Sequence, residues 1–381
     1  MTPTPLHLWV PNLFEFKGGI QVYLQDFLLA LEKTDKHSRL TIFDKLDTQN
    51  PTEQLQSEQF SFHFSGQIYQ PFRTLHFSLN LFLGALFDHP KLIICGHLNF
   101  APIALVLNAV FKIPYWILVY GVDAWDIDNP LKVQALKQAE KIISIGDYTR
   151  DRLLTKQKLS KDQIPLLPVT FDASDFSIEP KPQYLLERYG LAASQPIILT
   201  VARLSEADQY KGYDQILKAL PAIRQAIPDV HYVLVGKGGD RPRVEALIKT
   251  LNLQDCVTLT GFVPDGELCD HYNLCDVFAM PSKGEGFGIV YLEALACGKP
   301  VLGGNQDGAI DALVNGELGV LVDPDDVDAI TQTLTQILQR EHSHPLLYQP
   351  EILRHKVVDY FGFEQFQKTL AHLLNDHFKT K

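Results

Sequence analysis

Two glutamates frame a glycine-rich segment in the C-terminal half of the chain. Glu285 and Glu293 are eight residues apart, with Gly286 and Gly288 between them, and a helical apolar pattern begins at Ile289. Glycines let backbone N–H groups approach a ligand closely, and a helix N-terminus favours an anion such as a diphosphate. Glu285 would accept hydrogen bonds from sugar hydroxyls, and Glu293, about one turn into the helix, from a ribose. On spacing alone, such glutamates are usually solvated surface residues.

Two cations could complete such a site. Arg203 follows a predicted buried strand over residues 197–201, and Lys211 precedes a predicted helix over residues 213–226. Both would lie at the carboxyl end of a strand, where parallel sheets bind their ligands. A guanidinium and an ammonium there can hold phosphate oxygens and stabilise a departing nucleoside diphosphate. The alternative is a pair of unrelated surface cations.

Strands alternate with helices in two successive series. The first series of predicted strands covers residues 6–10, 40–43, 92–95, 115–120 and 141–145, and the second covers residues 197–201, 231–235, 257–260, 277–280, 300–303 and 319–322. This order predicts an α/β protein with two Rossmann-like, doubly wound parallel-sheet domains facing an interdomain cleft.

The segment 165–182 is rich in Pro, Asp and Ser and lacks periodicity, which indicates a linker. We therefore predict an N-terminal domain over residues 1–178 and a C-terminal domain over residues 183–356. The last segment, residues 357–381, has the apolar pattern of a helix, and we expect it to pack back on the first domain.

The composition excludes some classes of function. A net charge of -11 argues against sequence-independent nucleic-acid binding, which needs clustered positive charge. Five sparse cysteines without a Cys-x-x-Cys pair suggest reduced thiols, and the start of the chain lacks the pattern of a signal peptide. We therefore expect a cytoplasmic protein, and we see no cluster of metal ligands.

Two apolar segments come nearest to the length of a membrane span. Residues 77–87 and 101–111 are shorter than the roughly 18 residues needed to span a bilayer, and we interpret both as buried or half-buried helices. Residues 72–87 could instead lie on a membrane surface. They carry one Arg and no Lys, whereas interfacial helices usually have a more basic polar face, so core packing is favoured.

Several motifs in a fixed order resemble a known family. Glu285 to Glu293 followed by Ala-Leu-Ala-Cys-Gly-Lys-Pro-Val is similar to the retaining glycosyltransferases of family 4, the glycosyl transferases group 1, which have the GT-B fold. The other matching motifs are Val201-Ala-Arg-Leu, Tyr210-Lys-Gly-Tyr, Gly236-Lys-Gly-Gly, Gly261-Phe-Val, Asn315-Gly316 and Gly18-Gly19. The resemblance covers nearly the whole chain and is strongest over residues 197–324.

The resemblance implies a role for each matching residue. Arg203 and Lys211 would bind the donor phosphates, Glu285 the transferred sugar and Glu293 the ribose. The remaining donor contacts would be Gly286, Phe287, Gly288, Ile289 and Gly236, and the base would lie near Phe262 and Val263. Gly19 of the N-terminal domain would face the phosphates or the acceptor. The N-terminal domain would bind the acceptor and the C-terminal domain the donor.

The resemblance also implies a reaction. A hexose would move from GDP-mannose or a UDP-hexose to a glycan or lipid-linked glycan, with retention of configuration and without a metal or cofactor. The diphosphate would leave through an oxocarbenium-like state and help to deprotonate the acceptor. Such acceptors imply peripheral contact with the cytoplasmic face of a membrane, and no nucleic acid is involved.

The N-terminal domain departs from the family pattern. Where many relatives have His-Gly after a strand, this chain has Tyr120-Gly121, so Tyr120 would contact the donor sugar through its hydroxyl or its carbonyl. Asp123 could contact sugar hydroxyls or the acceptor, or it could cap a turn. His97, at another strand end, could bind the acceptor or transfer a proton, and a structural role is an equal alternative.

Three other functions remain open at this level. A sugar-nucleotide epimerase of the same fold would need additional acid and base residues, which we cannot assign. A dinucleotide-dependent oxidoreductase is suggested by Gly236-x-Gly238, but no acidic ribose-binding residue follows the next strand. A non-catalytic sugar-nucleotide-binding protein would not need the complete set of Arg203, Lys211, Glu285 and Glu293.

Overall fold

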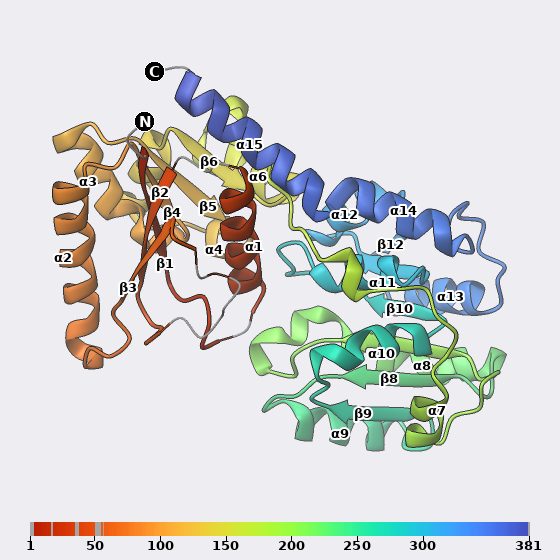
Figure 1. Ribbon diagram of the computed structural model, residues 1–381. Helices are drawn as coiled ribbons and strands as arrows, with labels where there is room; N and C mark the ends of the chain where they lie inside the picture. The colour runs from red at the N-terminus through yellow and green to blue at the C-terminus, as the bar shows by residue number, and fades with distance from the viewer. Residues whose placement is uncertain (1–3, 17, 35–37, 50–54, 56, 380–381) are drawn as a thin grey trace. The chain divides into compact units, whose positions relative to one another are not determined.

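The computed structural model describes residues 4–16, 18–34, 38–49, 55 and 57–379 (Figure 1). The chain forms two compact units, one of residues 1–170 with 363–381 and the other of residues 171–362. The first boundary between them falls inside the segment 165–182, which was expected to be the linker. The last 19 residues of the chain belong to the first unit.

The first unit is built on a six-stranded parallel sheet with the order β3-β2-β1-β4-β5-β6. Its strands are β1 (Thr4–Val10), β2 (Ser38–Asp44), β3 (Phe60–Phe64), β4 (Leu92–Cys95), β5 (Tyr115–Val119) and β6 (Lys141–Ser144). Its longer helices are α1 (Gly19–Thr34), α2 (Gln70–Asp88), α3 (Ala101–Phe111), α5 (Pro130–Gln138), α6 (Asp147–Gln157) and α15 (Phe363–Lys379).

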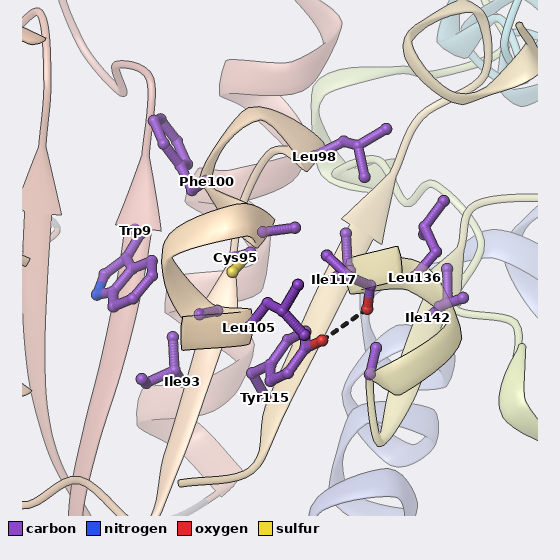
Figure 2. Packing of buried hydrophobic residues seen from close by; sticks show 14 of the residues in the cluster. Trp9, Ile93, Cys95, Leu98, Phe100, Leu105, Tyr115, Ile117, Leu136 and Ile142 are labelled. Carbon is purple, nitrogen blue, oxygen red and sulfur yellow. Dashed lines mark hydrogen bonds between the residues drawn. The ribbon is translucent and has the colours of Figure 1, made fainter. Parts of the chain in front are cut away.

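Helices cover both faces of this sheet. Helix α3 packs beside α2 and α5, and α1 packs against α15 on the other face (Figure 1). The core under α2, α3 and α5 contains Trp9, Ile93 and Leu105, and the buried Tyr115 donates a hydrogen bond to the Ala135 carbonyl there at 2.6 Å (Figure 2). Strands buried on both faces explain the continuous apolar runs in the sequence.

The second unit is built on another six-stranded parallel sheet with the order β12-β11-β10-β7-β8-β9. Its strands are β7 (Ile197–Val201), β8 (His231–Val235), β9 (Val257–Gly261), β10 (Val277–Met280), β11 (Val301–Gly304) and β12 (Val320–Val322). Its longer helices are α7 (Gln183–Tyr189), α8 (Tyr213–Ala226), α9 (Arg241–Thr250), α10 (Leu268–Leu274), α11 (Ile289–Ala296), α13 (Val327–Leu338) and α14 (Pro350–Phe361).

The two sheets have the same connectivity. In each sheet the first strand of the series lies between the second and the fourth, which is the 3-2-1-4-5-6 order of doubly wound folds. The strand order therefore reverses between β1 and β4 in the first unit and between β7 and β10 in the second. The predicted pair of Rossmann-like, doubly wound sheets is confirmed, and each has one such reversal point where ligands bind.

Three details of the sequence prediction were wrong. Strand β3 was not predicted, because Phe60–Phe64 is a short aromatic run at the edge of the sheet. The helix expected from residue 357 is two helices, α14 and α15, separated by Gly362, whose extended ψ of 154° ends α14. Core packing of residues 72–87 holds for only one side of α2, because Phe72 and Leu75 are exposed.

None of the helices in the described ranges is long and apolar enough to span a bilayer.

We predict that Tyr115→Phe lowers the free energy of unfolding of the first unit by about 1 kcal/mol, because it removes the buried hydrogen bond to the Ala135 carbonyl. Tyr69→Phe is the matched control, since Tyr69 is 73% exposed. Urea denaturation followed by tryptophan fluorescence measures the change, because all three tryptophans of the chain lie in this unit. Equal effects of the two substitutions would contradict the prediction.

Candidate functional site

The predicted donor residues of the second unit lie at one edge of its sheet. Arg203 follows β7, Gly236 follows β8, Phe262 follows β9 and the loop with Glu285 follows β10. The carboxyl ends of parallel strands meet at the same edge, and β7 and β10 flank the reversal point. The structure thus brings together, on neighbouring strands, residues that are more than 80 positions apart in the sequence.

Lys211 and Glu285 form an ion pair. The Lys211 Nζ donates to Glu285 Oε2, and the two side chains are only 13% and 17% exposed. Burial lowers the pKa of Lys211, but neighbouring Glu285 and Tyr210 outweigh it, and the pKa lies above its ordinary value. Lys211 is therefore a cation at neutral pH, held at the reversal point and screened from water, and a phosphate would compete with Glu285 for it.

Arg203 has one ion-pair partner among the described residues, and most of its side chain is exposed. Its Nη2 donates to Asp208 Oδ1 at 3.0 Å, while its side chain remains 61% exposed. Asp208 is buried and also accepts a hydrogen bond from the Ser205 hydroxyl. The buried carboxylate orients the guanidinium and leaves most of it accessible to a ligand, as the sequence predicts for a phosphate-binding arginine.

Glu293 lies in the second turn of α11, and its position is fixed by neighbours. The hydroxyl of the fully buried Tyr272 donates to Glu293 Oε2 at 2.5 Å. At the other end of the helix, Arg354 Nη1 donates to the Ala296 carbonyl at 2.6 Å. The contact with Arg354 fixes the C-terminal end of α11, and the contact with Tyr272 fixes the direction of the Glu293 side chain relative to the loop before the helix.

Asp307 is a functional candidate that the sequence analysis missed. It is fully buried, and its Oδ2 accepts hydrogen bonds from the Glu285 amide and the Ser282 hydroxyl, both at 2.7 Å. Its Oδ1 accepts from the Ala309 amide at 3.0 Å, and the Gly308 amide donates to the Glu285 carbonyl at 2.9 Å. Asp307 therefore fixes the backbone on which Glu285 is carried.

Burial raises the pKa of Asp307, and the hydrogen bonds from the Glu285 amide and the Ser282 hydroxyl oppose this rise. These donors compensate a carboxylate that forms no salt bridge with any of the described residues. The sequence signal for this role is weak, because Asn-Gln-Asp-Gly after a strand is typical of an ordinary turn.

Two glycines are required by the backbone of the site. Gly236 has a φ of 145°, and a Cβ there would lie 1.7 Å from the Ala202 carbonyl oxygen. Gly288 has a φ of 95° and precedes α11 directly. Between Gly286 and Gly288, the side chain of Phe287 is buried against the Phe361 ring at 5.4 Å, so only its peptide group is available to a ligand.

The predicted base contacts differ from each other. Phe262 is 63% exposed, and Lys237 Nζ lies 4.4 Å from the centre of its ring. The Val263 side chain is buried, so it packs under the loop and does not face a ligand. An exposed aromatic face beside a cation is suited to stacking with a planar base.

The predicted residues of the first unit also follow adjacent strands. Gly19 begins α1 after β1, His97 follows β4, and Tyr120 to Asp123 follow β5. The Tyr120 hydroxyl donates to the Gly96 carbonyl at 3.0 Å, and the Tyr120 ring packs edge-on against Tyr23. The Tyr120 hydroxyl therefore joins the ends of β5 and β4 through this hydrogen bond.

Asp123 caps the turn after Tyr120-Gly121. Its Oδ1 accepts from the Tyr120 amide at 2.9 Å, and its buried Oδ2 has no hydrogen-bond partner among the described residues. Burial raises the pKa of Asp123 to about 7, although the Tyr120 amide opposes the rise. A carboxyl group near half-protonation at neutral pH could accept or donate a hydrogen bond.

His97 begins a short 3-10 turn. Its Nδ1 accepts from the Asn99 amide at 3.1 Å, which leaves the ring proton on Nε2 when the imidazole is neutral. Burial and the nearby Lys132 lower the pKa of His97, so the neutral form dominates at neutral pH. The His97 side chain thus has a structural partner through Nδ1, and within the described part of the chain Nε2 forms no hydrogen bond.

Across the described ranges, His, Cys, Asp and Glu side chains form no group of three or more that could hold a metal ion.

Comparison with known proteins supports the resemblance predicted from the motifs. Residues 185–350 match the family described as Glycosyl transferases group 1. The resemblance predicted from the motifs is confirmed. The matched segment contains the residues at the carboxyl edge of the second sheet, including Arg203, Lys211, Glu285 and Glu293.

Among curated proteins, the chain is 35% identical over 208 residues to a GDP-mannose-dependent alpha-(1-6)-phosphatidylinositol monomannoside mannosyltransferase of Mycolicibacterium smegmatis, an alignment that covers 52% of this chain and 53% of that protein. It is 29% identical over 192 residues to an alpha-D-kanosaminyltransferase of Streptomyces kanamyceticus, which covers 50% and 49%. The chain spans about half the length of the curated relatives it matches.

Among solved structures, sucrose-phosphate synthase from Thermosynechococcus elongatus matches with a TM-score of 0.81 at 22% identity, covering 99% of this chain and 100% of the other. This likeness extends over both units and confirms the predicted GT-B fold.

We predict that Asp307→Ala increases hydrogen exchange at the Glu285 amide by about tenfold or more, because the amide loses a buried acceptor worth about 1–3 kcal/mol. Asp307→Asn keeps one acceptor oxygen and should have a smaller effect. Hydrogen-exchange mass spectrometry of peptides that include residue 285 measures both. Asp325→Ala is the control, since its exposed carboxylate forms a salt bridge with Lys283. Unchanged exchange in Asp307→Ala would contradict the assigned role.

Proposed function

We propose that this protein is a glycosyltransferase that moves a hexose from a nucleoside-diphosphate sugar to a glycan or lipid-linked glycan. The observation that carries the proposal is the ion pair between Lys211 and Glu285, with Arg203 on the neighbouring loop, at the reversal point of the second sheet. This sheet lies within the segment that matches the glycosyl transferase family. Two cations for a diphosphate and a carboxylate for sugar hydroxyls are the groups that such a donor requires.

In the proposed donor complex, the diphosphate replaces Glu285 as the partner of Lys211 and also contacts the exposed guanidinium of Arg203. Glu285 is then free to accept hydrogen bonds from hydroxyls of the transferred sugar. Glu293, whose direction is set by Tyr272, binds the ribose hydroxyls, and the peptide groups of residues 286–289 lie at the start of α11, where anions are favoured. Phe262 stacks on the base.

The same groups account for the proposed chemistry. As the bond between the sugar and the diphosphate breaks, negative charge grows on the leaving phosphate, and Lys211 and Arg203 stabilise it. Since Lys211 is poorly exposed, its field acts through a medium that screens it less than bulk water does. We propose that the reaction retains the anomeric configuration, that the leaving phosphate accepts the acceptor proton, and that no metal ion takes part.

For the first unit we propose acceptor binding. His97, with a neutral imidazole, and Asp123, with its unpartnered buried oxygen, offer polar groups for hydroxyls. Tyr120 is reassigned to support these residues through its hydrogen bond to Gly96, and only its carbonyl is left as a donor-sugar contact. A cytoplasmic location, at or near the inner face of a membrane, stays part of this proposal.

A donor panel tests the proposal. GDP-mannose is the first candidate because the named function of the 35% identical mannosyltransferase depends on it, and UDP-glucose is the second because a structural neighbour from Anabaena has been solved with it. Each donor is incubated with and without glycan and lipid-linked glycan acceptors. Transfer that requires an acceptor is expected. Epimerised donor without an acceptor would favour an epimerase, and binding without turnover would favour a non-catalytic binding protein.

We predict that Glu285→Ala abolishes transfer and leaves affinity for the nucleoside diphosphate unchanged or higher, because the substitution frees Lys211 from its carboxylate partner. Glu293→Ala should weaken nucleoside diphosphate binding itself, by about 1.5–3 kcal/mol, if a charged hydrogen-bond acceptor for the ribose is lost. Calorimetry with the bare diphosphate separates the two. Glu245→Ala, at an exposed salt bridge on α9, is the control. Equal losses in both variants would overturn this division of roles.

We predict that EDTA leaves transferase activity unchanged, because the cations that face the diphosphate in this proposal are side chains. The rate is measured before and after chelation with the donor that the panel identifies. Loss of activity that a divalent ion restores would contradict the prediction.

A further inference from the structure

Helix α2 is apolar on two opposite sides. Phe77, Leu81 and Ala85 recur every four residues and are buried against the sheet. On the opposite side of the same helix, Leu75 and Leu79 are 71% and 53% exposed. A soluble helix normally has one apolar stripe, which faces the core, so the second stripe of α2 has no partner within the unit.

The exposed stripe continues onto the neighbouring helix. Helices α2 and α3 pack side by side in the layer that covers one face of the sheet, with the Phe82 and Phe111 rings 6.1 Å apart (Figure 1). We define the α2–α3 face by six exposed side chains: Phe72, Leu75, Leu79, Phe87, Val106 and Val110. Of the seventeen large apolar side chains that are exposed in the described residues, nine lie between positions 69 and 111. Such clustering marks an interaction surface, whereas scattered exposed residues would not.

The charge around this face differs from that of the whole chain. Residues 59–122 contain three cations, Arg73, Lys91 and Lys112, and a single carboxylate, Asp88, in a chain with a net charge of -11. Asp88 is bound to His7 at 3.0 Å. Lys91 and Lys112 are exposed, Lys91 three residues beyond the C-terminal end of α2 and Lys112 directly after α3. The face is therefore apolar with a cationic margin.

We propose that the α2–α3 face binds the surface of an anionic phospholipid bilayer. Its apolar side chains would enter the boundary between headgroups and acyl chains, and Lys91 and Lys112 would contact lipid phosphates. The low number of carboxylates lets this side of an otherwise acidic protein approach an anionic surface. Two copies of the chain joined through this face would bring like charges together, so a bilayer fits the charge pattern better than a second copy does.

The structure changes the prediction made for residues 72–87. A single Arg on residues 72–87 spoke against an interfacial helix, because the cations were counted on α2 alone. The structure adds Lys91 and Lys112 from the adjoining loop and from the end of α3, and it shows that the apolar stripe is exposed. The inference rests on the proposed function only in naming the surface for the membrane location proposed there. Its test uses neither donor nor acceptor, so its failure would leave the transferase activity untouched.

Vesicle co-sedimentation of the full chain tests the proposal, with phosphatidylcholine vesicles that contain or lack phosphatidylglycerol. The wild-type protein is expected to bind the anionic vesicles and to be released by salt. The double variant Leu75→Gln/Leu79→Gln should bind about tenfold or more weakly, because two apolar side chains no longer enter the lipid. The control is Ile352→Gln, an exposed apolar residue of the second unit. Circular dichroism checks that the variants are folded.

A second double variant tests the contribution of the two lysines at the margin of the face. Lys91→Gln/Lys112→Gln should weaken binding to anionic vesicles and reduce its dependence on salt, while any binding to neutral vesicles stays the same. The proposal is overturned if the wild-type protein does not bind anionic vesicles, or if Leu75→Gln/Leu79→Gln binds like the control. It is also overturned if sedimentation velocity shows a dimer that this variant dissociates, in the absence of vesicle binding.

Discussion

The ion pair between Lys211 and Glu285 is the interaction on which the candidate donor site depends. It joins the segment after β7 to the loop after β10, and it lies where the strand order of the second sheet reverses. Two opposite charges that are this poorly exposed are costly unless they are paired, so each holds the other in place until a ligand competes. In the proposed donor complex, a diphosphate replaces the carboxylate beside Lys211 and thereby releases Glu285 for a sugar.

The surroundings of this pair restrict how its backbone can move. Asp307 binds the Glu285 amide, and the Gly308 amide binds the Glu285 carbonyl, so the loop is fixed through its main chain on both sides of the residue. Tyr272 does the same for the side chain of Glu293. The proposed site thus combines two carboxylates for hydroxyls with two cations for phosphates. Asp208, Tyr272 and Asp307 hold Arg203, Glu293 and the backbone of Glu285 and have no direct role in the proposed chemistry, whereas Lys211 is held by Glu285 itself.

Much of this could be predicted from the sequence, because it depends on local patterns. Buried parallel strands are continuous apolar runs, and the residues that follow them share one edge of the sheet, so the sequence alone predicts Arg203, Lys211 and Glu285 in one site. Asp307 was missed because its role depends on a tertiary contact with the loop after β10. The hydrogen bond of the Tyr120 hydroxyl and the exposed side of α2 could not be predicted for the same reason, since burial of an aromatic or apolar side chain is decided by its neighbours in space.

The central claim is that the second unit holds a nucleoside diphosphate at this ion pair. A crystal structure of the protein with the diphosphate of the donor that it uses tests the claim most directly. The account predicts diphosphate oxygens within hydrogen-bond distance of Lys211 and Arg203, ribose hydroxyls on Glu293, and a Lys211 that no longer contacts Glu285. A diphosphate bound elsewhere, with the contact between Lys211 and Glu285 intact, would contradict it.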